Sequence, residues 1–295
     1  MTSEHGVDAV LRELRFGAGA APLDAGPFRF DADFDSAERW PDVAYDTGEP
    51  GARHDAAGRS RVAQVLDAAA RTMALRAPAA RRLVDAHLER VLLRASRTAP
   101  GRSDSHRSCV GRCLITNLHE PAEATLVATE AVTHEAIHQL LYRTEEATGL
   151  FCDLASLPTF RSPWTGARLA LHSLVHATFV WSGLLSLWSE LARAPASAAE
   201  AAHARARIAH CLFGFAFLDD VLVSPAFPTG DVAPAVFEAM RSLATTACRA
   251  TRQAEPGQTL RQVAAAREDA GWPAALAAGL VGLAGPALSA PGAGA

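Results

Sequence analysis

The chain has 295 residues and a mass of 31.1 kDa, with 49% hydrophobic and 20% charged residues, which excludes a disordered or fibrous protein. A net charge of −4 and a pI near 6.3 give no reason to expect nucleic acid or an anionic membrane as a partner. All 28 basic residues are arginine, so a P-loop lysine, a Schiff-base lysine and a lysine general base are excluded.

The first part of the chain predicts a helix, an irregular segment and two further helices. Apolar residues recur at helical spacing over residues 4–15. From residue 17 to about residue 58, Gly, Pro and Asp with scattered aromatic residues favour a segment that wraps around the core. Residues 59–96 show a period near 3.6 that breaks around Pro78, which predicts two helices.

The rest of the chain predicts one strand and a series of helices. Residues 99–108 are rich in Pro, Gly and Ser, which predicts a loop. Residues 109–118 form a short β-branched segment flanked by loop residues, which predicts a strand. Helical periodicity then dominates, over residues 121–147, 168–193, 197–223, 232–252 and 258–269.

These elements predict a mainly α fold, with a single helical domain and a minor β element at about residues 109–118. The β element is expected beside the helix at 121–147. We expect three parts along the chain: an N-terminal helix and irregular wrapping segment at 1–58, a helical metal-binding catalytic domain at 59–285, and a flexible tail at 286–295.

Membrane association and secretion are both disfavoured by the sequence. Leu169–Trp188 is long and apolar enough to raise the question of a membrane span. Because it carries two histidines near its start and has amphipathic neighbours, we interpret it as a buried core helix. The N-terminus shows no basic segment followed by an apolar one, so no secretory signal is expected. The five scattered cysteines favour free thiols in a reducing cytoplasm.

One short motif stands out in the helix predicted at 121–147: HEAIH at residues 134–138, an HExxH pattern. Positions i and i+4 share one face of a helix, so His134 and His138 can reach one metal ion at about 2.1 Å from each nitrogen. Glu135 is rotated by about 100° from His134, where it can touch an oxygen ligand of that ion. The alternative is a chance occurrence, with both histidines packed or solvated.

A second i,i+4 pair, His172 and His176, lies in the strongly apolar helix predicted at 168–193. An unpaired polar group inside a protein costs roughly 1–3 kcal/mol, so buried imidazoles need partners. A metal ion would satisfy that need, with His176 as its third ligand. Hydrogen bonds to backbone or hydroxyl groups are the alternative.

The residues around the HExxH pattern do not complete a known zinc-peptidase motif. The extended metzincin motif needs glycine at 141 and histidine at 144, where the chain has Leu141 and Thr144. The glutamate that other zinc peptidases place on a second helix is missing from residues 158–168. A zinc peptidase with Glu135 as its general base would therefore lack the usual third ligand.

Three segments together resemble a bacterial protein family: HEAIH at 134–138, FRSPW at 160–164 and LVHATF at 174–179. The family is that of the HExxH-motif proteins of ribosomal-peptide natural-product gene clusters, regarded as 2-oxoglutarate-dependent peptide β-hydroxylases. In these proteins an HExxH helix is followed by a Ser-Pro-Trp turn, an arginine and a helix with a Leu-x-His element. The resemblance covers roughly residues 109–190 and implies a non-haem iron dioxygenase.

The resemblance implies roles for the residues of the HExxH helix and its neighbour. His134, His138 and His176 would bind Fe(II), in an arrangement similar to the facial triad of non-haem oxygenases with imidazole in place of the carboxylate. Glu135 would be a catalytic-site residue, and three roles stay open for it: fourth ligand, orienting group or substrate contact.

The resemblance also implies 2-oxoglutarate as cosubstrate, and its distal carboxylate needs a cation. Because the chain has no lysine, this cation must be arginine, ideally with bidentate hydrogen bonds. Arg168, eight residues before His176, is the first choice and Arg161 the second; a solvated arginine is the alternative for each. His172 would contact the metal ligands without binding the metal itself. Trp164 would form a pocket wall or a part of the core.

Three hypotheses follow for function. The first is Fe(II)/2-oxoglutarate-dependent hydroxylation, at Cβ, of a residue in a ribosomally synthesised precursor peptide. The second is a zinc metallopeptidase that uses the HExxH motif. The third is a binding module whose histidines are structural. The precursor peptide is the expected partner, with no nucleic acid and no membrane, and the sequence carries no information on the oligomeric state.

Overall fold

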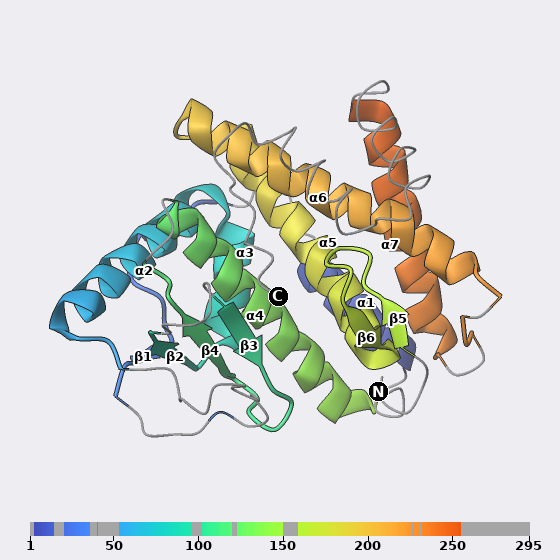
Figure 1. Cartoon of the computed structure of the whole chain (residues 1–295), viewed down its shortest axis with the longest axis horizontal. Coiled ribbons are helices and arrows are strands. Elements are labelled where there is room, and N and C mark those ends of the chain that lie inside the picture. The colour runs from blue at the N-terminus through green and yellow to red at the C-terminus, as the bar shows by residue number, and fades with distance from the viewer. Residues whose placement is uncertain are drawn as a thin grey trace, which may run out of the picture. The chain divides into compact units, whose positions relative to one another are not determined.

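The chain divides into two compact units in the computed structural model (Figure 1). Unit 1 comprises Met1–Ala9 and Thr148–Ala295, and unit 2 comprises Val10–Ala147. The residues that the structure describes are 3–14, 21–35, 40, 53–95, 102–119, 123–149, 159–225, 227–229 and 232–254.

The predicted mainly α fold is confirmed, because helices account for most of the described residues. The helices are α1 (Ser3–Leu14), α2 (Ala56–Arg76), α3 (Pro78–His87), α4 (Ala124–Thr148), α5 (Leu171–Arg193), α6 (Ala198–Val223) and α7 (Pro234–Ala254). The strands are β1 (Asp31–Asp33), β2 (Arg90–Arg94), β3 (Arg102–Ser105), β4 (Arg112–Thr116), β5 (Thr159–Arg161) and β6 (Arg168–Ala170).

Two of the predicted parts lie beyond what the structure describes, namely the helix at 258–269 and the tail at 286–295. The segment boundary expected at residues 58 and 59 stays a prediction. The predicted strand at 109–118 is confirmed as β4.

Unit 2 is built on a four-stranded sheet with the strand order β1-β2-β4-β3. Strands β1, β2 and β4 are parallel, and β3 is antiparallel to β4. The register aligns Arg90–Arg94 with Arg112–Thr116 residue by residue. Val91, Leu92 and Leu93 are each at most 1% exposed, so the strand β2 is buried on both faces, as is usual in parallel sheets.

Three strands correct the sequence-based expectation. β6 replaces the first three residues of the helix expected at 168–193, because they pair with β5. β2 replaces the end of the helix expected to run to residue 96, because the apolar run Val91–Leu93 fits a buried strand as well as a helix and periodicity alone does not separate them. β3 occupies part of the loop expected at 99–108. It has no apolar alternation of its own and exists because β4 supplies its backbone hydrogen bonds.

The break between α2 and α3 follows from local chemistry. The Asp55 carboxylate caps α2 by accepting a hydrogen bond from the Gly58 N–H at 2.6 Å. The helix ends at Ala77, whose N–H donates to the carbonyl of Met73. Pro78 then begins α3 at a position where its missing N–H is not needed. The predicted break near Pro78 is confirmed.

A buried glutamine fastens α4 to the β3–β4 edge of the sheet. The Gln139 side-chain amide donates to the Arg112 carbonyl at 2.8 Å and to Ser105 Oγ at 2.9 Å, and its oxygen accepts from the Gly111 N–H at 2.7 Å. Gly111 has φ +82°, and a Cβ there would also meet the Glu89 carboxylate. This face of α4 therefore belongs to the core of unit 2.

Unit 1 contains the hairpin β5–β6 and the helices α5, α6 and α7, which contact one another (Figure 1). α5 starts directly after β6, and Leu174, Val175 and Phe179 on it are fully buried. The interpretation of Leu169–Trp188 as a core segment is confirmed. None of the helices in the described part of the chain is long and apolar enough to cross a bilayer.

The Trp164 indole joins the β5–β6 turn to α6. It is 1% exposed, stacks on Trp181 at 5.8 Å between ring centroids, and donates a hydrogen bond from Nε1 to the Cys211 carbonyl at 3.1 Å. It lies against Gly214, where an added Cβ would come within 1.9 Å of Nε1. Trp164 can therefore occupy this position only because residue 214 has no side chain.

We predict that Gly214→Ala lowers the free energy of unfolding by about 3 kcal/mol, because the new methyl group displaces Trp164 and breaks its hydrogen bond. Urea unfolding followed by circular dichroism measures this change. Gly26→Ala is the matched control, since a Cβ there has no neighbour within 4 Å. Equal stability of the two variants would contradict the prediction.

Candidate metal centre

The HExxH residues lie on α4 with the two imidazoles on one face. The His134 and His138 ring centroids are 5.0 Å apart, and His138 stacks on Tyr142 at 6.1 Å. The His134 side chain is 31% exposed. At about 100° per residue, Glu145 shares this face with both histidines, so α4 carries a line of three groups that bind metals.

Glu135 points to a different side of α4, into the core of unit 2. Its side chain is 1% exposed, and one carboxylate oxygen accepts a hydrogen bond from Ser105 Oγ. The other oxygen, Oε1, is buried, has no hydrogen-bond partner among the described residues, and lies 3.9 Å from His134 Nε2. Burial raises the pKa of Glu135, although His134 and hydrogen bonds from Ser103 and Ser105 oppose that shift.

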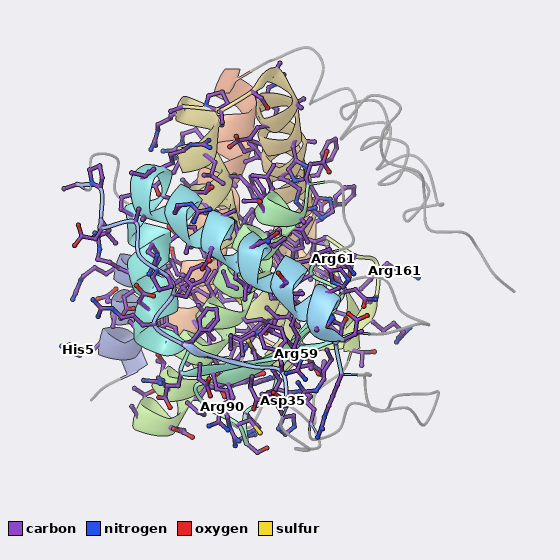
Figure 2. All side chains as sticks on the ribbon, turned by 90° about the vertical axis from the view of Figure 1, so that its left-hand side faces the viewer. His5, Asp35, Arg59, Arg61, Arg90 and Arg161 are labelled. Carbon is purple, nitrogen blue, oxygen red and sulfur yellow. The ribbon has the colours of Figure 1, made fainter. Side chains whose placement is uncertain are left out.

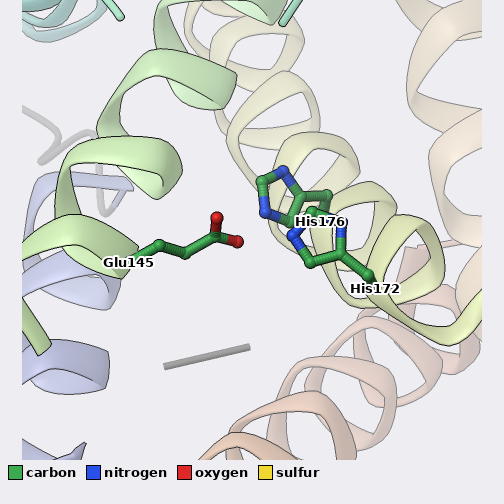
Figure 3. A group of neighbouring side chains, drawn as sticks. All are labelled: Glu145, His172 and His176. Atoms are coloured by element: carbon green, nitrogen blue, oxygen red, sulfur yellow. The ribbon is translucent and has the colours of Figure 1, made fainter. Parts of the chain in front are cut away.

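The second histidine pair lies on the first turns of α5. The His172 and His176 ring centroids are 4.3 Å apart, and Figure 3 shows the two rings on the same side of the helix. His176 is 1% exposed and His172 is half-buried. The i,i+4 spacing places both imidazoles on one face of the helix, as predicted from the sequence.

Glu145, on the last turn of α4, completes a group with these two histidines (Figure 3). Each of the three side chains offers one ligand atom, and these atoms lie within 4.8 Å of one another. Glu145 is 4% exposed. Two imidazoles and one carboxylate are a donor set that non-haem Fe(II) and Zn²⁺ both accept, so this group could hold a metal ion.

The group overlaps only in part with the ligands that the sequence predicted. His176 belongs to both sets, His172 was expected behind the ligands, and His134 and His138 are not members of the group. Along α4, Glu145 lies about 10 Å from His138, so one ion binds either the HExxH pair or Glu145. The predicted ligand set of His134, His138 and His176 stays a prediction.

Sequence reasoning missed Glu145 for a physical reason. It lies in a polar stretch at the end of a helix, where glutamates are usually solvated. Its position seven residues after His138 places it on the face of the two imidazoles, and that spacing was the only signal in the sequence. Its burial depends on tertiary contacts.

Two arginines face each other across the β5–β6 hairpin. Arg161 and Arg168 are register partners, so their side chains emerge on the same face, and both are exposed. Arg168 donates from Nε and Nη2 to Thr159 Oγ1, and Arg161 donates from Nη1 to the Gly166 carbonyl. Among the described residues neither has a carboxylate partner. Like charges directly opposite on a sheet repel, and an anion between them would relieve that repulsion.

Trp164, which the sequence analysis placed as a pocket wall or a core residue, is packed in the core of unit 1. Its ring meets Trp181 and, edge to face, Phe215. Ser162 supports the same turn, because its Oγ accepts hydrogen bonds from the N–H groups of Trp164 and Thr165. The Ser-Pro-Trp segment therefore builds the turn that connects the two arginine-bearing strands.

Sequence comparison does not identify a family for this chain. No protein-family model matches it, and no curated protein matches it. The function is therefore argued from the chemistry of the site, since a fold alone does not imply an activity.

We predict that the chain binds one divalent metal ion through Glu145, His172 and His176. Glu145→Gln, His172→Ala and His176→Ala should each reduce bound metal from about one ion per chain to near zero, because each removes one of three donors. His138→Ala should keep its metal. Elemental analysis of anaerobically loaded protein measures the stoichiometry, with far-ultraviolet circular dichroism as the folding control. Loss of metal in His138→Ala with retention in Glu145→Gln would assign the HExxH set instead.

We predict that Glu135→Gln increases stability relative to the native chain, and that the increase grows with pH. The pKa of Glu135 is raised in the folded state from its ordinary value of 4.5, so folding becomes less favourable as pH rises from about that value through the folded pKa. Glutamine cannot ionise and escapes this loss. Urea unfolding of the metal-free proteins at acidic and neutral pH tests the trend. A constant difference between the variants across this range would contradict it.

Proposed function

We propose that the protein is an Fe(II)- and 2-oxoglutarate-dependent hydroxylase that oxidises a residue, at Cβ, in a ribosomally synthesised precursor peptide. The observation that carries this proposal is the donor set Glu145, His172 and His176. Two histidines and one carboxylate are the ligand combination typical of non-haem Fe(II) oxygenases.

The residues fit the metal and its cosubstrate. Glu145, His172 and His176 would hold Fe(II), which when bound supplies oxygen activation and a point of attachment for 2-oxoglutarate. In the proposed reaction 2-oxoglutarate, O₂ and the peptide C–H give succinate, CO₂ and the peptide C–OH. One oxygen atom enters succinate and the other enters the peptide, so no further oxidant is needed.

The arginine pair would bind the distal carboxylate of 2-oxoglutarate. Arg168 lies four residues before His172, and Arg161 is its partner across the hairpin. A guanidinium offers two parallel N–H groups to one carboxylate, which a point-charge ammonium does not. With two arginines on one face of the hairpin, the site would select a cosubstrate with a second carboxylate over a monocarboxylic 2-oxo acid.

The resemblance to the HExxH peptide hydroxylases supports the reaction class, and two of its shared segments contribute a residue to the proposed site, namely Arg161 and His176. HEAIH lies on α4 together with Glu145, FRSPW forms β5 and the turn behind it, and LVHATF contains His176 on α5. The precursor peptide as substrate rests on this resemblance alone. A cytoplasmic location is part of the proposal, and the free, buried Cys109, Cys113 and Cys211 fit a reducing compartment.

A zinc metallopeptidase is the competing function, and the position of Glu135 disfavours it. In a zinc peptidase, the Glu135 carboxylate would have to reach the substrate site and act there as a general base. Here that carboxylate is buried and accepts a hydrogen bond from Ser105. The second histidine pair does not supply a replacement, because the residue after His172 is Ser173.

We predict that, with Fe(II), 2-oxoglutarate and O₂, the enzyme adds about 16 Da to the precursor peptide encoded beside it and forms succinate in equal amount. Mass spectrometry of the peptide and quantification of succinate measure both products. Zinc-loaded enzyme should be inactive. Cleavage of the peptide by the zinc form, independent of 2-oxoglutarate, would replace the hydroxylase proposal with the peptidase.

The arginine assignment has its own control in the same assay. Arg168→Ala should raise the 2-oxoglutarate concentration needed for half-maximal rate by about tenfold or more while leaving bound metal unchanged, since a charged hydrogen bond is lost. Arg193→Ala, at the far end of α5, is the matched control and should change neither quantity.

A further inference from the structure

The carboxyl ends of the parallel strands in unit 2 carry a second group of polar residues that the proposed reaction does not use. β1, β2 and β4 end at Asp33, Arg94 and Thr116, at one edge of the sheet. Asn117 follows β4 with φ +53°, a left-handed conformation that asparagine adopts more readily than most residues, and its N–H donates to the Arg94 carbonyl at 3.0 Å.

The polar side chains at this edge are buried. His54 is 6% exposed, Arg94 5% and Asn117 1%. The His54 and His119 rings meet edge to face at 5.1 Å between centroids. The Nδ1 atom of His119 is buried and has no hydrogen-bond partner among the residues that the structure describes. A buried ring nitrogen without a partner costs free energy, which a ligand that accepts or donates a hydrogen bond would recover.

Charged groups of both signs lie around these histidines: the guanidiniums of Arg53, Arg59 and Arg94, and the carboxylates of Asp33, Asp35 and Asp55. Arg59 forms an ion pair with Asp35 through both of its terminal nitrogens (Figure 2), and it also donates from Nε to the His54 carbonyl. The hydrogen bond from Arg59, with the nearby charges of Arg53 and Arg94, lowers the pKa of Asp35. Three guanidiniums therefore act on this one carboxylate.

The other acidic groups at the edge are already engaged. The Asp55 carboxylate caps α2, and the Asp33 carboxylate accepts from the Asp35 N–H. A metal cation would need a third ligand besides the two imidazoles, and the described residues bring no such group together here. An anion would instead meet the His119 Nδ1 atom as a donor and the buried Arg94 guanidinium as a cation, since the nearby carboxylates are already hydrogen-bonded within the chain.

We propose that this edge, at His54, Arg94 and His119, binds an oxyanion: the phosphate or carboxylate group of a small molecule. The His119 imidazole donates from Nδ1 to an oxygen of the anion, and the guanidiniums provide the attractive field. The proposal does not depend on the hydroxylase proposal, because it uses residues of unit 2 alone.

Isothermal titration calorimetry in a buffer free of phosphate and carboxylate tests the proposal with two probes, inorganic phosphate and succinate. We expect one saturable site for at least one probe, and the probe that saturates identifies the class of ligand. His119→Ala should weaken binding by about tenfold or more, because a hydrogen bond to a charged group is lost. If His119→Ala unfolds, the exposed Arg53→Ala variant replaces it and should weaken binding severalfold.

Two controls separate this site from other cationic places on the chain. Arg61→Ala, an exposed residue of the same helix as Arg59, should bind as the native chain does. Arg168→Ala should also keep this site, whereas it should lose a dicarboxylate bound at the hairpin. Absence of saturation with both probes, unchanged binding in His119→Ala, or loss of the only site in Arg168→Ala would each overturn the proposal.

Discussion

The placement of Trp164 against Gly214 is the constraint on which the functional part of unit 1 depends. The indole fills the space that a side chain at 214 would need, and its hydrogen bond to Cys211 prevents it from sliding along α6. With the tryptophan held in this way, the turn that follows Ser162 is held too. This turn connects β5 to β6, and α5 follows β6 directly, so the positions of Arg161, Arg168 and the two histidines of α5 depend on it.

Helix α4 presents the residues of the HExxH pattern to different neighbours. Glu135 and Gln139 form one polar face, which hydrogen-bonds to β3 and β4. His134, His138 and Glu145 form another face, where groups that bind metals are lined up. A helix rotates by about 100° per residue, so adjacent residues of a motif naturally serve different neighbours. In this chain the glutamate of the motif, Glu135, accepts a hydrogen bond from Ser105 on β3.

The use of arginine as the only basic side chain gives the protein a particular way of handling anions. Two of the settings in which guanidiniums occur are an exposed facing pair on the β5–β6 hairpin and a group around Asp35 in unit 2. The hairpin pair brings like charges together, which is unfavourable without a counter-ion, whereas Asp35 is itself the counter-ion of the second group. Planar forks with parallel N–H groups suit carboxylates and phosphates at both places, because two hydrogen bonds form for each oxyanion.

The local patterns of the sequence determined most helices, the strand β4, the break at Pro78 and the pairing of His172 with His176, because helical spacing and capping act over a few residues. They did not reveal β2 or β3, since an apolar run such as Val91–Leu93 fits two structures and β3 exists only through its pairing with β4. The grouping of Glu145 with His172 and His176, the core role of Trp164 and the facing of Arg161 with Arg168 were likewise decided by tertiary structure. These features depend on burial and on partners distant in sequence, and the free energy of a buried polar group is set by the neighbours that the fold brings to it.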